Sequence, residues 1–587
     1  MKNQELSKIF YEIANILKAE RVGFRPYAYR KAALELGNLE EDVSEIYIQG
    51  GKEALEKIPG IGKSIAEKIE EYLRTGKIEY HQELKKKMPI KMGELISVEG
   101  VGPRMAKMLY KKLGVKNLKD LEKAAKSHRI AKLPGFGEKT EKNILQSISF
   151  LKKSKGRFLL GNVLAKVEKM KEGFRNIKEV EKISEAGSVR RRKETIGDVD
   201  LLVSVKESKE PASANASAGK IMDFFVSMPG VVKIWGKGET KSSVRTKQGL
   251  EVDLRVVPKR SFGAALQYFT GSKEHNIKTR KVAMSKGLKL NEYGVFKGKK
   301  MIAGKDEKEI YKSLGMQWVP PEIREDKGEI EASLKGKLPE LVELKDIKGD
   351  LHSHSSWDGG TDSILEMAKA CIDMGYQYLG ISDHTKFLRI EHGLNEKELF
   401  LQRKEIDKLN SKFEIRNSKF RILQGCEVNI LNDGSLDIKD EALKKLDYVI
   451  AGVHSSFKMP RREMTKRIIK AVKNPYVKIL SHPTGRLIKQ RDEYLADWDE
   501  IFKAAKDFGV VLEINAHPKR LDLNDRNIRI AKEMGIKMAI NSDAHHISQL
   551  GNMRFGVFQA RRGWAEKNDI INTLSLKELS EILKTKK

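Results

Sequence analysis

The sequence predicts a multidomain protein with an α-helical N-terminal region, an α/β middle region and a C-terminal βα-repeat barrel. Three observations support this fold class. Apolar residues recur at helical spacing in 1–155, β-branched runs appear in 156–260, and short apolar strands alternate with helical stretches from residue 348 onward. A chain of 587 residues is also too long for one hydrophobic core, so roughly three to five folding units are expected.

The composition, with 40% hydrophobic residues, is typical of a soluble globular protein. No apolar run approaches the ~18 residues of a membrane helix, so no membrane partner is expected. The N-terminal stretch MKNQELSKIFYEIANILKAE is amphipathic and contains acidic residues, unlike a signal peptide. Cys371 and Cys426 are far apart, which predicts buried thiols without a disulfide and a reducing, cytoplasmic location.

The charge is strongly basic, with a formal net value of +31. Residues 1–347 carry 71 basic and 48 acidic residues, so most of the excess lies there. A solvated, lysine-rich surface is one explanation of this charge. The other is a polyanionic partner, nucleic acid above all.

Three similar segments interrupt the N-terminal helical pattern: IPGIGKSIAEKI (58–69), VEGVGPRMAKML (98–109) and LPGFGEKTEKNI (133–144). Glycine permits the tight turn, and the free N–H groups at the following helix start can hold a phosphate oxygen. The segments resemble helix-hairpin-helix motifs, which hold the DNA backbone without reading sequence. The predicted DNA-binding glycines are Gly60, Gly62, Gly100, Gly102, Gly135 and Gly137.

The middle region contains three predicted strands, VDLLVSV (199–205), GVVKIW (230–235) and LEVDLRVV (250–257). Between the first two, the polar Ala/Ser-rich stretch 206–220 is predicted to be a loop. Residues 261–320 mix short helical and turn signals, and the Pro- and charge-rich stretch 321–347 is predicted to be a linker.

Paired carboxylates occur on two of these strands. Asp198 and Asp200 are two residues apart and therefore share one face, and Asp253 shares a face with Glu251 and Arg255. Carboxylates on adjacent strands repel one another unless a cation lies among them. Two divalent ions, for which Mg²⁺ is the expected species, would stabilise an in-line displacement at phosphorus. Solvated aspartates on an exposed sheet face are the alternative.

The order of the motifs is more specific than any one of them. G-S-x-x-R (187–191) precedes G-D-V-D (197–200), then D-L-R (253–255) and YFTGSKEHN (268–276). Together they resemble a family X DNA polymerase, the family of DNA polymerase beta. The resemblance implies that Asp198 and Asp200 bind both ions and that Asp253 binds the ion that activates the primer hydroxyl. It implies nucleotide-binding residues Gly187, Ser188, Arg191, Arg157, Tyr268, Phe269, Gly271, Asn276 and Arg280.

The N-terminal segments PYAYRKAALEL (26–36) and 58–78 resemble the small lyase domain of the same family. Lys68 stands at the position of the lysine that attacks the sugar aldehyde of a nicked abasic site. Arg25 and Lys63 are the candidates for contacts with a 5′-phosphate. Some relatives keep this domain only for binding, and Lys68 as an ordinary helix lysine is the alternative.

The C-terminal third gathers metal-ligand side chains at or just after predicted strand ends, where βα barrels assemble their sites. Histidine with carboxylate suits Zn²⁺, Mn²⁺ or Fe²⁺ better than Mg²⁺. These residues are His352, His354, Asp358, Asp383, His384, Glu427, His454, His482, Asp543 and His545.

The segments D-L-H-S-H-S, I-S-D-H, G-C-E-V, G-V-H-S, S-H-P and N-S-D-A-H resemble a PHP (polymerase and histidinol phosphatase) domain over nearly all of 348–587. The resemblance implies three metal ions and an active hydrolase. One ion would be held by His352, His354, Glu427 and Asp543, a second by Glu427, His454 and His482, and a third by Asp358, His384 and His545. Asp383 is predicted to orient a ligand, whereas His392, His517 and His546 are predicted to be structural or supporting.

The combined prediction is a repair polymerase of the bacterial and archaeal PolX type, which fills gaps in base excision repair and carries a PHP 3′–5′ exonuclease. Its predicted partners are gapped DNA with a 5′-phosphate and dNTPs, and its predicted state is a cytoplasmic monomer. The alternatives are a nuclease or phosphatase with a degenerate polymerase half, and a polymerase with a purely structural PHP metal domain. The predicted division is 1–88 lyase-like, 89–155 fingers-like, 156–260 palm, 261–320 thumb, 321–347 linker and 348–587 PHP.

Overall fold

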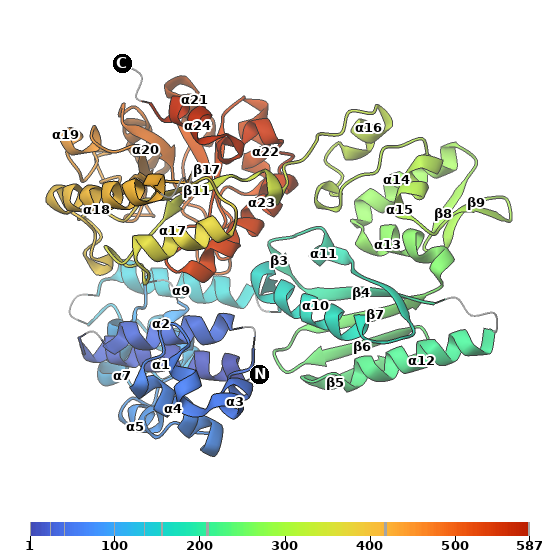
Figure 1. Cartoon of the computed structure of the whole chain (residues 1–587), viewed down its shortest axis with the longest axis horizontal. Coiled ribbons are helices and arrows are strands. Elements are labelled where there is room, and N and C mark those ends of the chain that lie inside the picture. Colours follow the sequence, from blue (N-terminus) through green and yellow to red (C-terminus); the bar gives the residue numbers. More distant parts are fainter. Residues whose placement is uncertain are drawn as a thin grey trace.

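The structure is a computed structural model that describes residues 2–23, 25–39, 41–98, 100–133, 136–153, 156–206, 211–415 and 420–584. The helical N-terminal region lies beside the C-terminal barrel-like region, and the α/β middle region lies next to both (Figure 1). The predicted fold class is confirmed.

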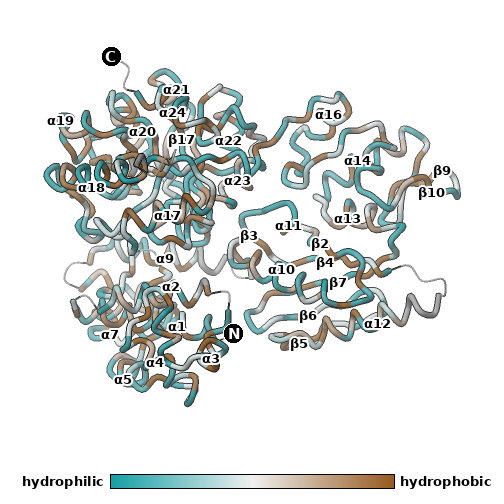
Figure 2. The backbone as a smooth tube through the Cα atoms, viewed as in Figure 1, coloured by the Kyte–Doolittle hydropathy of each residue, from teal (hydrophilic) through white to brown (hydrophobic). Residues whose placement is uncertain are grey.

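The N-terminal region is built around its first helix, which carries Leu6, Phe10, Ile13 and Leu17 as one buried stripe. This stripe packs against the second and seventh helices. Figure 2 shows hydrophobic and hydrophilic residues alternating along these helices, as expected where one face of each is buried. The helices are α1 (Lys2–Glu20), α2 (Arg25–Asn38), α3 (Val43–Glu56), α4 (Lys63–Thr75), α5 (Glu79–Lys87), α6 (Met92–Ile96), α7 (Pro103–Leu113), α8 (Leu118–Lys126) and α9 (Glu138–Lys153).

The middle region holds a mixed sheet in the strand order β2-β4-β7-β6-β5. Its elements are β1 (Phe158–Leu159), α10 (Leu160–Arg175), β2 (Val180–Glu185), α11 (Gly187–Arg190), β3 (Thr195–Ile196), β4 (Asp198–Val205), α12 (Pro211–Ser227), β5 (Val231–Lys237), β6 (Lys241–Thr246) and β7 (Glu251–Val257). Strands β4 and β7 are parallel, and their register pairs Asp200 with Asp253. Val199, Val252 and Leu254 point to the buried face, where α10 and α12 pack.

The prediction of a loop over 206–220 is wrong for the part that the structure describes, because Pro211–Ser227 forms α12. Alanine has the highest helix propensity, and the apolar residues that fix this helix come only in its last turns. Ile221, Met222 and Phe225 are buried against the sheet. Residues 207–210 of the predicted loop lie outside the described residues.

The thumb and the segment that follows it pack as one unit. The thumb elements are α13 (Phe262–Thr270), α14 (Lys273–Ser285), β8 (Lys289–Asn291), β9 (Gly294–Lys297), β10 (Lys300–Ala303) and α15 (Glu307–Ser313). The stretch predicted as a linker contains η2 (Pro321–Ile323), α16 (Glu329–Leu334) and η3 (Leu344–Asp346). Its charged residues are buried rather than solvated: Arg324 Nη1 donates to Glu307 at 2.6 Å, and Glu329 is 2.7 Å from His275 Nδ1.

Strands β11–β18 of the C-terminal region are parallel and form two sheets, β11-β12-β13 and β14-β15-β16-β17-β18. The bridges Ser353–Ala544 and His384–Glu427 join the sheets and give a barrel-like closure. The strands are β11 (Gly349–Ser353), β12 (Tyr378–Ile381), β13 (Arg421–Gln424), β14 (Glu427–Asn429), β15 (Val449–Gly452), β16 (Val477–Leu480), β17 (Val511–Asn515) and β18 (Met538–Asn541). The helices are α17 (Ile364–Asp373), α18 (Glu396–Ile415), α19 (Asp440–Leu443), α20 (Arg461–Val472), α21 (Trp498–Phe508), α22 (Asp525–Glu533), α23 (Met553–Arg562) and α24 (Leu576–Leu583).

The barrel interior is filled by apolar side chains below the metal-ligand residues. Tyr448 lies in this core, and its hydroxyl donates a hydrogen bond to the Leu351 carbonyl at 2.6 Å. Its ring lies against Gly380 and Gly425, where any side chain would collide with it. No helix among the described residues is both long and apolar enough to cross a membrane.

We expect Gly380→Ala to destabilise the barrel by ~1–3 kcal/mol, because the added methyl group would overlap the Tyr448 hydroxyl and lie 2.9 Å from Leu351 Cα. Calorimetric unfolding measures the effect. Gly551→Ala is the matched control, since a methyl group there meets no atom within 4 Å. Equal melting temperatures for the two variants would contradict the packing described here.

Candidate active sites

The carboxylate of Glu427 is the centre of a buried cluster of imidazoles. Its Oε2 lies 3.0 Å from His384 Nδ1 and 3.3 Å from His352 Nε2. Its Oε1 lies 2.9 Å from His482 Nε2 and 3.3 Å from His454 Nε2. Glu427 begins β14, whereas the histidines lie in β11 or directly after β12, β15 and β16. The structure therefore brings these five side chains together at one end of the barrel strands.

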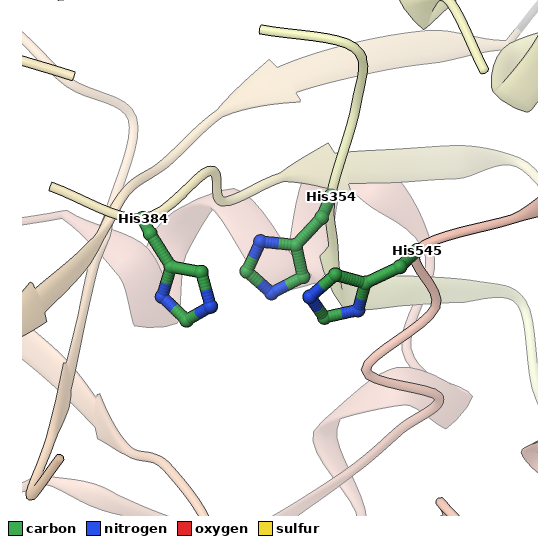
Figure 3. A group of neighbouring side chains, drawn as sticks. All are labelled: His354, His384 and His545. Atoms are coloured by element: carbon green, nitrogen blue, oxygen red, sulfur yellow. The ribbon is translucent and has the colours of Figure 1, made fainter. Parts of the chain in front are cut away.

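A second group of side chains lies next to it. Figure 3 shows His354, His384 and His545 pointing toward one another from the loops after β11, β12 and β18. The ring centroids of His354 and His545 are 4.0 Å apart, and those of His354 and His384 are 4.4 Å apart. Asp543 Oδ1 lies 3.4 Å from His354 Nε2.

Neighbouring acceptors orient three of the rings. His352 Nδ1–H donates to Glu513 Oε1 at 2.6 Å, His354 Nδ1–H to Asp358 Oδ2 at 2.7 Å, and His454 Nδ1–H to Asn429 Oδ1 at 2.7 Å. A hydrogen bond at Nδ1 leaves the lone pair of Nε2 as the ligand atom. All three Nε2 atoms face the cluster.

The donor set fits divalent metal ions. Buried atoms without a hydrogen-bond partner include His352 Nε2, His354 Nε2, His384 Nδ1, His454 Nε2 and Glu427 Oε2. A buried polar atom left unpaired costs ~1–3 kcal/mol, so five converging ones indicate an absent ligand. Candidate ligand atoms lie within 4.8 Å of one another in the groups His354–His384–His545, His352–His354–Asp543 and His384–Glu427–His454.

Neighbouring charges and burial each control the protonation of part of this cluster. Burial raises the pKa of Glu427, but the charges of His352, His454 and His384 outweigh it and hold that pKa well below the usual value. Burial lowers the pKa of His545 to about 3, which keeps this imidazole neutral as a metal ligand must be.

Two aspartates of the predicted site are held by hydrogen bonds. Asp358 accepts from His354 Nδ1, from the His384 backbone N–H at 2.8 Å and from the Gly360 N–H at 2.9 Å. It therefore orients His354, and its role as a ligand stays a prediction. Asp383 accepts from the Ser355 hydroxyl at 2.6 Å and from Gln402 Nε2 at 2.5 Å, which fixes the loop after His354.

The sequence did not single out several residues that support this centre. Glu513 accepts hydrogen bonds from His352, from the His482 N–H at 2.6 Å and from Asn541 at 2.9 Å. Ser481 Oγ donates to Glu427 at 2.7 Å, and Arg520 Nε lies 3.5 Å from Asp543 Oδ2. A lone glutamate inside the apolar strand VVLEI was the available signal for Glu513.

The backbone is strained at two predicted ligands. His482 has φ 25° and Asp543 has φ 53°, although neither is glycine. Such conformations persist only where surrounding contacts impose them, and they concentrate at functional sites. Of the other histidines, His546 and His392 contact α2, and His517 accepts from the Lys519 N–H at 3.3 Å.

The aspartates of the middle sheet form the other candidate site. Asp198 and Asp200 project from one face of β4, and Asp253 lies opposite Asp200 on β7. Burial, Asp198 and Asp253 raise the pKa of Asp200 to about 6. Lys241 Nζ lies 3.2 Å from Asp253 Oδ2 and so places a cation beside the cluster. A carboxylate group of this kind fits a divalent ion.

Two predicted nucleotide-binding segments, 187–191 and 268–271, lie close to each other, and the first also lies against Asp200. Gly187 has φ +56°, and a methyl group there would overlap the Asp200 carboxylate, so glycine is required. Ser188 follows it in α11. Arg191 bonds the Thr270 carbonyl and Glu325 Oε1, the latter at 3.0 Å, which brings it next to Gly271. Arg157 instead bonds Thr195 beside the turn before Asp198.

The thumb residues lie on α13 and α14. The Tyr268 and Phe269 rings are 5.1 Å apart, and Phe269 stacks under the Arg255 guanidinium. Asn276 is buried, donates to the Tyr268 carbonyl at 2.7 Å and accepts from Gln267 at 2.8 Å. Arg280 Nε bonds the Asn276 carbonyl at 3.3 Å. The Asn276 amide is thus engaged within the protein.

The hairpin glycines lie just before the first residues of helices, as the motif requires. Gly62 and Gly102 precede α4 and α7 without a side-chain cap, and Gly60 and Gly100 have φ of +77° and +83°. Gly137 precedes α9, whereas Gly135 lies outside the described residues. Arg25 and Lys63 begin α2 and α4 and are exposed.

Lys68 lies in an open pocket of about 400 Å³ whose other lining residues are Glu67, Glu71, Glu79, Glu83 and Tyr80. Its Nζ donates to the Ser64 carbonyl and hydroxyl, each at 3.2 Å. Four carboxylates around Lys68 repel the phosphates of a nicked abasic site, which does not favour the predicted lyase step at this lysine.

Comparison with known proteins places the chain in a family. Over 96% of its length the chain is 38% identical to the DNA polymerase/3′-5′ exonuclease PolX of Bacillus subtilis (strain 168), and it covers 95% of that protein. The chain belongs to the PolX family of DNA polymerase/3′-5′ exonucleases. Family profiles match as DNA polymerase beta thumb (265–325), helix-hairpin-helix domain (1–78), SAM-like helix-hairpin-helix tandem (92–149) and PHP domain (350–517).

Other relatives resemble parts of this PolX chain. A probable phosphatase of Thermoanaerobacter sp. (strain X514) is 32% identical over 250 residues, which are 40% of this chain and 95% of that protein. A crystal structure of Leishmania infantum polymerase beta in a ternary P/T complex covers 40% of this chain and 97% of its own, with 25% identity and a TM-score of 0.27.

We expect Asp200→Asn to stabilise the metal-free PolX protein by ~1–3 kcal/mol at about pH 8 and to have little effect at about pH 3. The folded pKa of about 6 exceeds the ordinary 3.8, so ionised Asp200 lowers stability above pH 6, and this loss disappears as pH falls below 3.8. Calorimetry at both pH values measures it, with exposed Asp507→Asn as control. Equal stabilisation at both pH values would show that the ionisation of the buried Asp200 carboxyl is not the cause.

Proposed function

We propose that this PolX chain transfers deoxynucleotides at the aspartate site of its palm and hydrolyses DNA 3′ ends at the histidine–carboxylate centre of its PHP domain. The observation that carries the proposal is that two separate sets of ligand side chains converge in a chain of this family. Gap filling in base excision repair is the proposed setting, because helix-hairpin-helix regions can hold both sides of a gap.

In the palm, Asp198, Asp200 and Asp253 would hold Mg²⁺. Bound Mg²⁺ would favour ionisation of the primer 3′-hydroxyl and neutralise the charge of the triphosphate. Arg191, Ser188 and the Gly187 turn would orient the triphosphate, while Tyr268, Phe269 and Gly271 would flank the sugar and base. Asn276 and Arg280 would lie on the same side of the nucleotide as Tyr268 and Phe269. Arg157 lies beside the turn before Asp198.

In the PHP domain, up to three ions of Mn²⁺ or Zn²⁺ would be held by the nine side chains predicted from the sequence, with Glu427 shared between two of them. Bound metal would supply a nucleophilic water and polarise the scissile phosphodiester. The Nε2 atoms of His352, His354 and His454 are held in place by Glu513, Asp358 and Asn429, which limits ring rotation.

A phosphomonoester at a DNA 3′ end is a second candidate substrate of this centre, since the probable phosphatases among the relatives match the same part of the chain. The proposed partners of the whole protein are gapped or primer–template DNA and dNTPs. Its proposed state is a cytoplasmic monomer. The proposed activities do not include a lyase step at Lys68, because the pocket around this lysine is lined by glutamates.

Two double variants test the assignment of separate sites. Asp198→Ala with Asp200→Ala should lower primer extension at least about 1,000-fold and spare 3′–5′ degradation, because only the palm carboxylates are removed. His352→Ala with His354→Ala should have the opposite effect. Extension and degradation of labelled primers with Mg²⁺ or Mn²⁺ measure both activities. Loss of both activities in each correctly folded variant would overturn the two-site assignment.

We expect Glu325→Gln to lower the KM for dNTPs about 3–10-fold, because Glu325 holds Arg191 at 3.0 Å and competes with the triphosphate for it. Steady-state gap filling measures the change. Glu331→Gln, a change of an exposed side chain on α16, is the control. A raised KM would mean instead that Glu325 positions Arg191 for the nucleotide.

A further inference from the structure

One face of α2 in the N-terminal region contacts three loops that carry predicted PHP ligands, those after β11, β12 and β18. Tyr27, Lys31 and Glu35 are four residues apart and therefore form one stripe of this helix. Lys31 Nζ lies 3.0 Å from Asp362, Glu35 lies 2.8 Å from His546 Nε2, and the Tyr27 hydroxyl lies 3.1 Å from His392 Nε2. Of these partners, Asp362 and His546 have fully or nearly fully buried side chains.

These contacts lie directly beside metal-ligand positions. His546 follows the ligand residue His545, and Asp362 is four residues after Asp358. Thr361 N–H donates to the His545 carbonyl at 2.9 Å, and Ile547 N–H donates to Asp362 at 2.8 Å. The helix is therefore attached to the edge of the metal centre through two loops that also hydrogen-bond to each other.

Three cations lie around the same edge. Arg520 Nε is 3.5 Å from Asp543 Oδ2, and Lys519 precedes it on the loop after β17. Arg30, the neighbour of Lys31 on α2, is exposed, as is Lys519. Arg30 adjoins Lys31, whose Nζ contacts Asp362, and Lys519 adjoins Arg520, whose Nε contacts Asp543. The loops of Asp362 and Asp543 are themselves joined by the hydrogen bond from Thr361 N–H to the His545 carbonyl. Desolvation and then the positive charge of Arg30 lower the pKa of Lys519, in agreement with this placement.

Like charges brought together at a docked interface are unfavourable unless an anion lies among them. The loop after His454 also meets the N-terminal region, because Lys458 bonds Asn143 of α9. In Figure 1, α2 and α9 lie between the remaining N-terminal helices and the PHP domain. The ligand that this arrangement suits is a chain of phosphates leading into the metal centre.

We propose that α2 forms one wall of the nuclease site and that Arg30, Lys519 and Arg520 bind successive phosphodiesters of the DNA strand whose 3′ end lies in the metal centre. The proposal rests on the proposed function of the PHP domain. Arg520 stands nearest the reacting phosphate, and Lys519 and Arg30 follow along the strand. The chemical class of ligand is a single-stranded polydeoxynucleotide.

The test uses the full chain with Mn²⁺ and two substrates, a single-stranded oligonucleotide and bis(p-nitrophenyl) phosphate, which has no neighbouring phosphates. Arg30→Gln and Lys519→Gln should each raise the KM for the oligonucleotide about tenfold with little change in kcat. Each should also reduce the salt dependence of that KM by about 0.7 in log–log slope. Hydrolysis of the small diester should stay at the wild-type rate.

Lys503→Gln is the matched control, because it removes an exposed positive charge from α21 of the same domain. It should change the hydrolysis of neither substrate. Lys31→Glu, which breaks the docking contact with Asp362, should reproduce the oligonucleotide effect of Arg30→Gln. The proposal is overturned if Arg30→Gln has no more effect than Lys503→Gln. It is also overturned if Arg30→Gln lowers the hydrolysis of both substrates by the same factor. A wild-type protein that cleaves neither substrate would instead contradict the proposed nuclease function.

Discussion

The buried carboxylate of Glu427 is the interaction on which the PHP site depends. A charge removed from water is tolerated only where opposite charges and hydrogen bonds surround it. Four histidines lie within 3.3 Å of its two oxygens, and they come from strands and loops of both sheets of the barrel. This carboxylate therefore ties the strand ends to one another and gives the metal ligands a common point of convergence.

Buried charge also joins the PHP domain to the polymerase half. Arg562 at the end of α23 is almost fully buried and contacts Asp525 at 2.7 Å, Glu325 at 3.3 Å and the Arg191 carbonyl at 2.9 Å. Arg486 pairs with Glu194 just before the palm aspartates. Separating the domains would remove partners from these buried charges, so the turn 187–191 is held against the PHP barrel.

The N-terminal region shows that a motif and its electrostatics are separate properties. The hairpin glycines and uncapped helix starts are those that a DNA backbone requires. The pocket of Lys68 in the same region nevertheless presents four glutamates. Its α2 helix instead contacts the PHP domain through Lys31 and Glu35, and Arg30 adjoins this contact. The backbone geometry that suits DNA is thus retained, while the proposed phosphate contacts lie on a different face.

The local sequence pattern alone determined where many of the candidate site residues lie on their strands. Period two placed Asp198 and Asp200 on one face of β4, and strand–helix alternation placed the histidines at the ends of barrel strands, because both follow from backbone geometry over a few residues. The helix over 211–227 escaped prediction, since its burial depends on the sheet it covers. Glu513, Arg520 and the contacts of α2 were decided only by the tertiary structure. Their partners are remote in sequence, and the periodicity of a local segment does not predict which charged residues contact each other across domains.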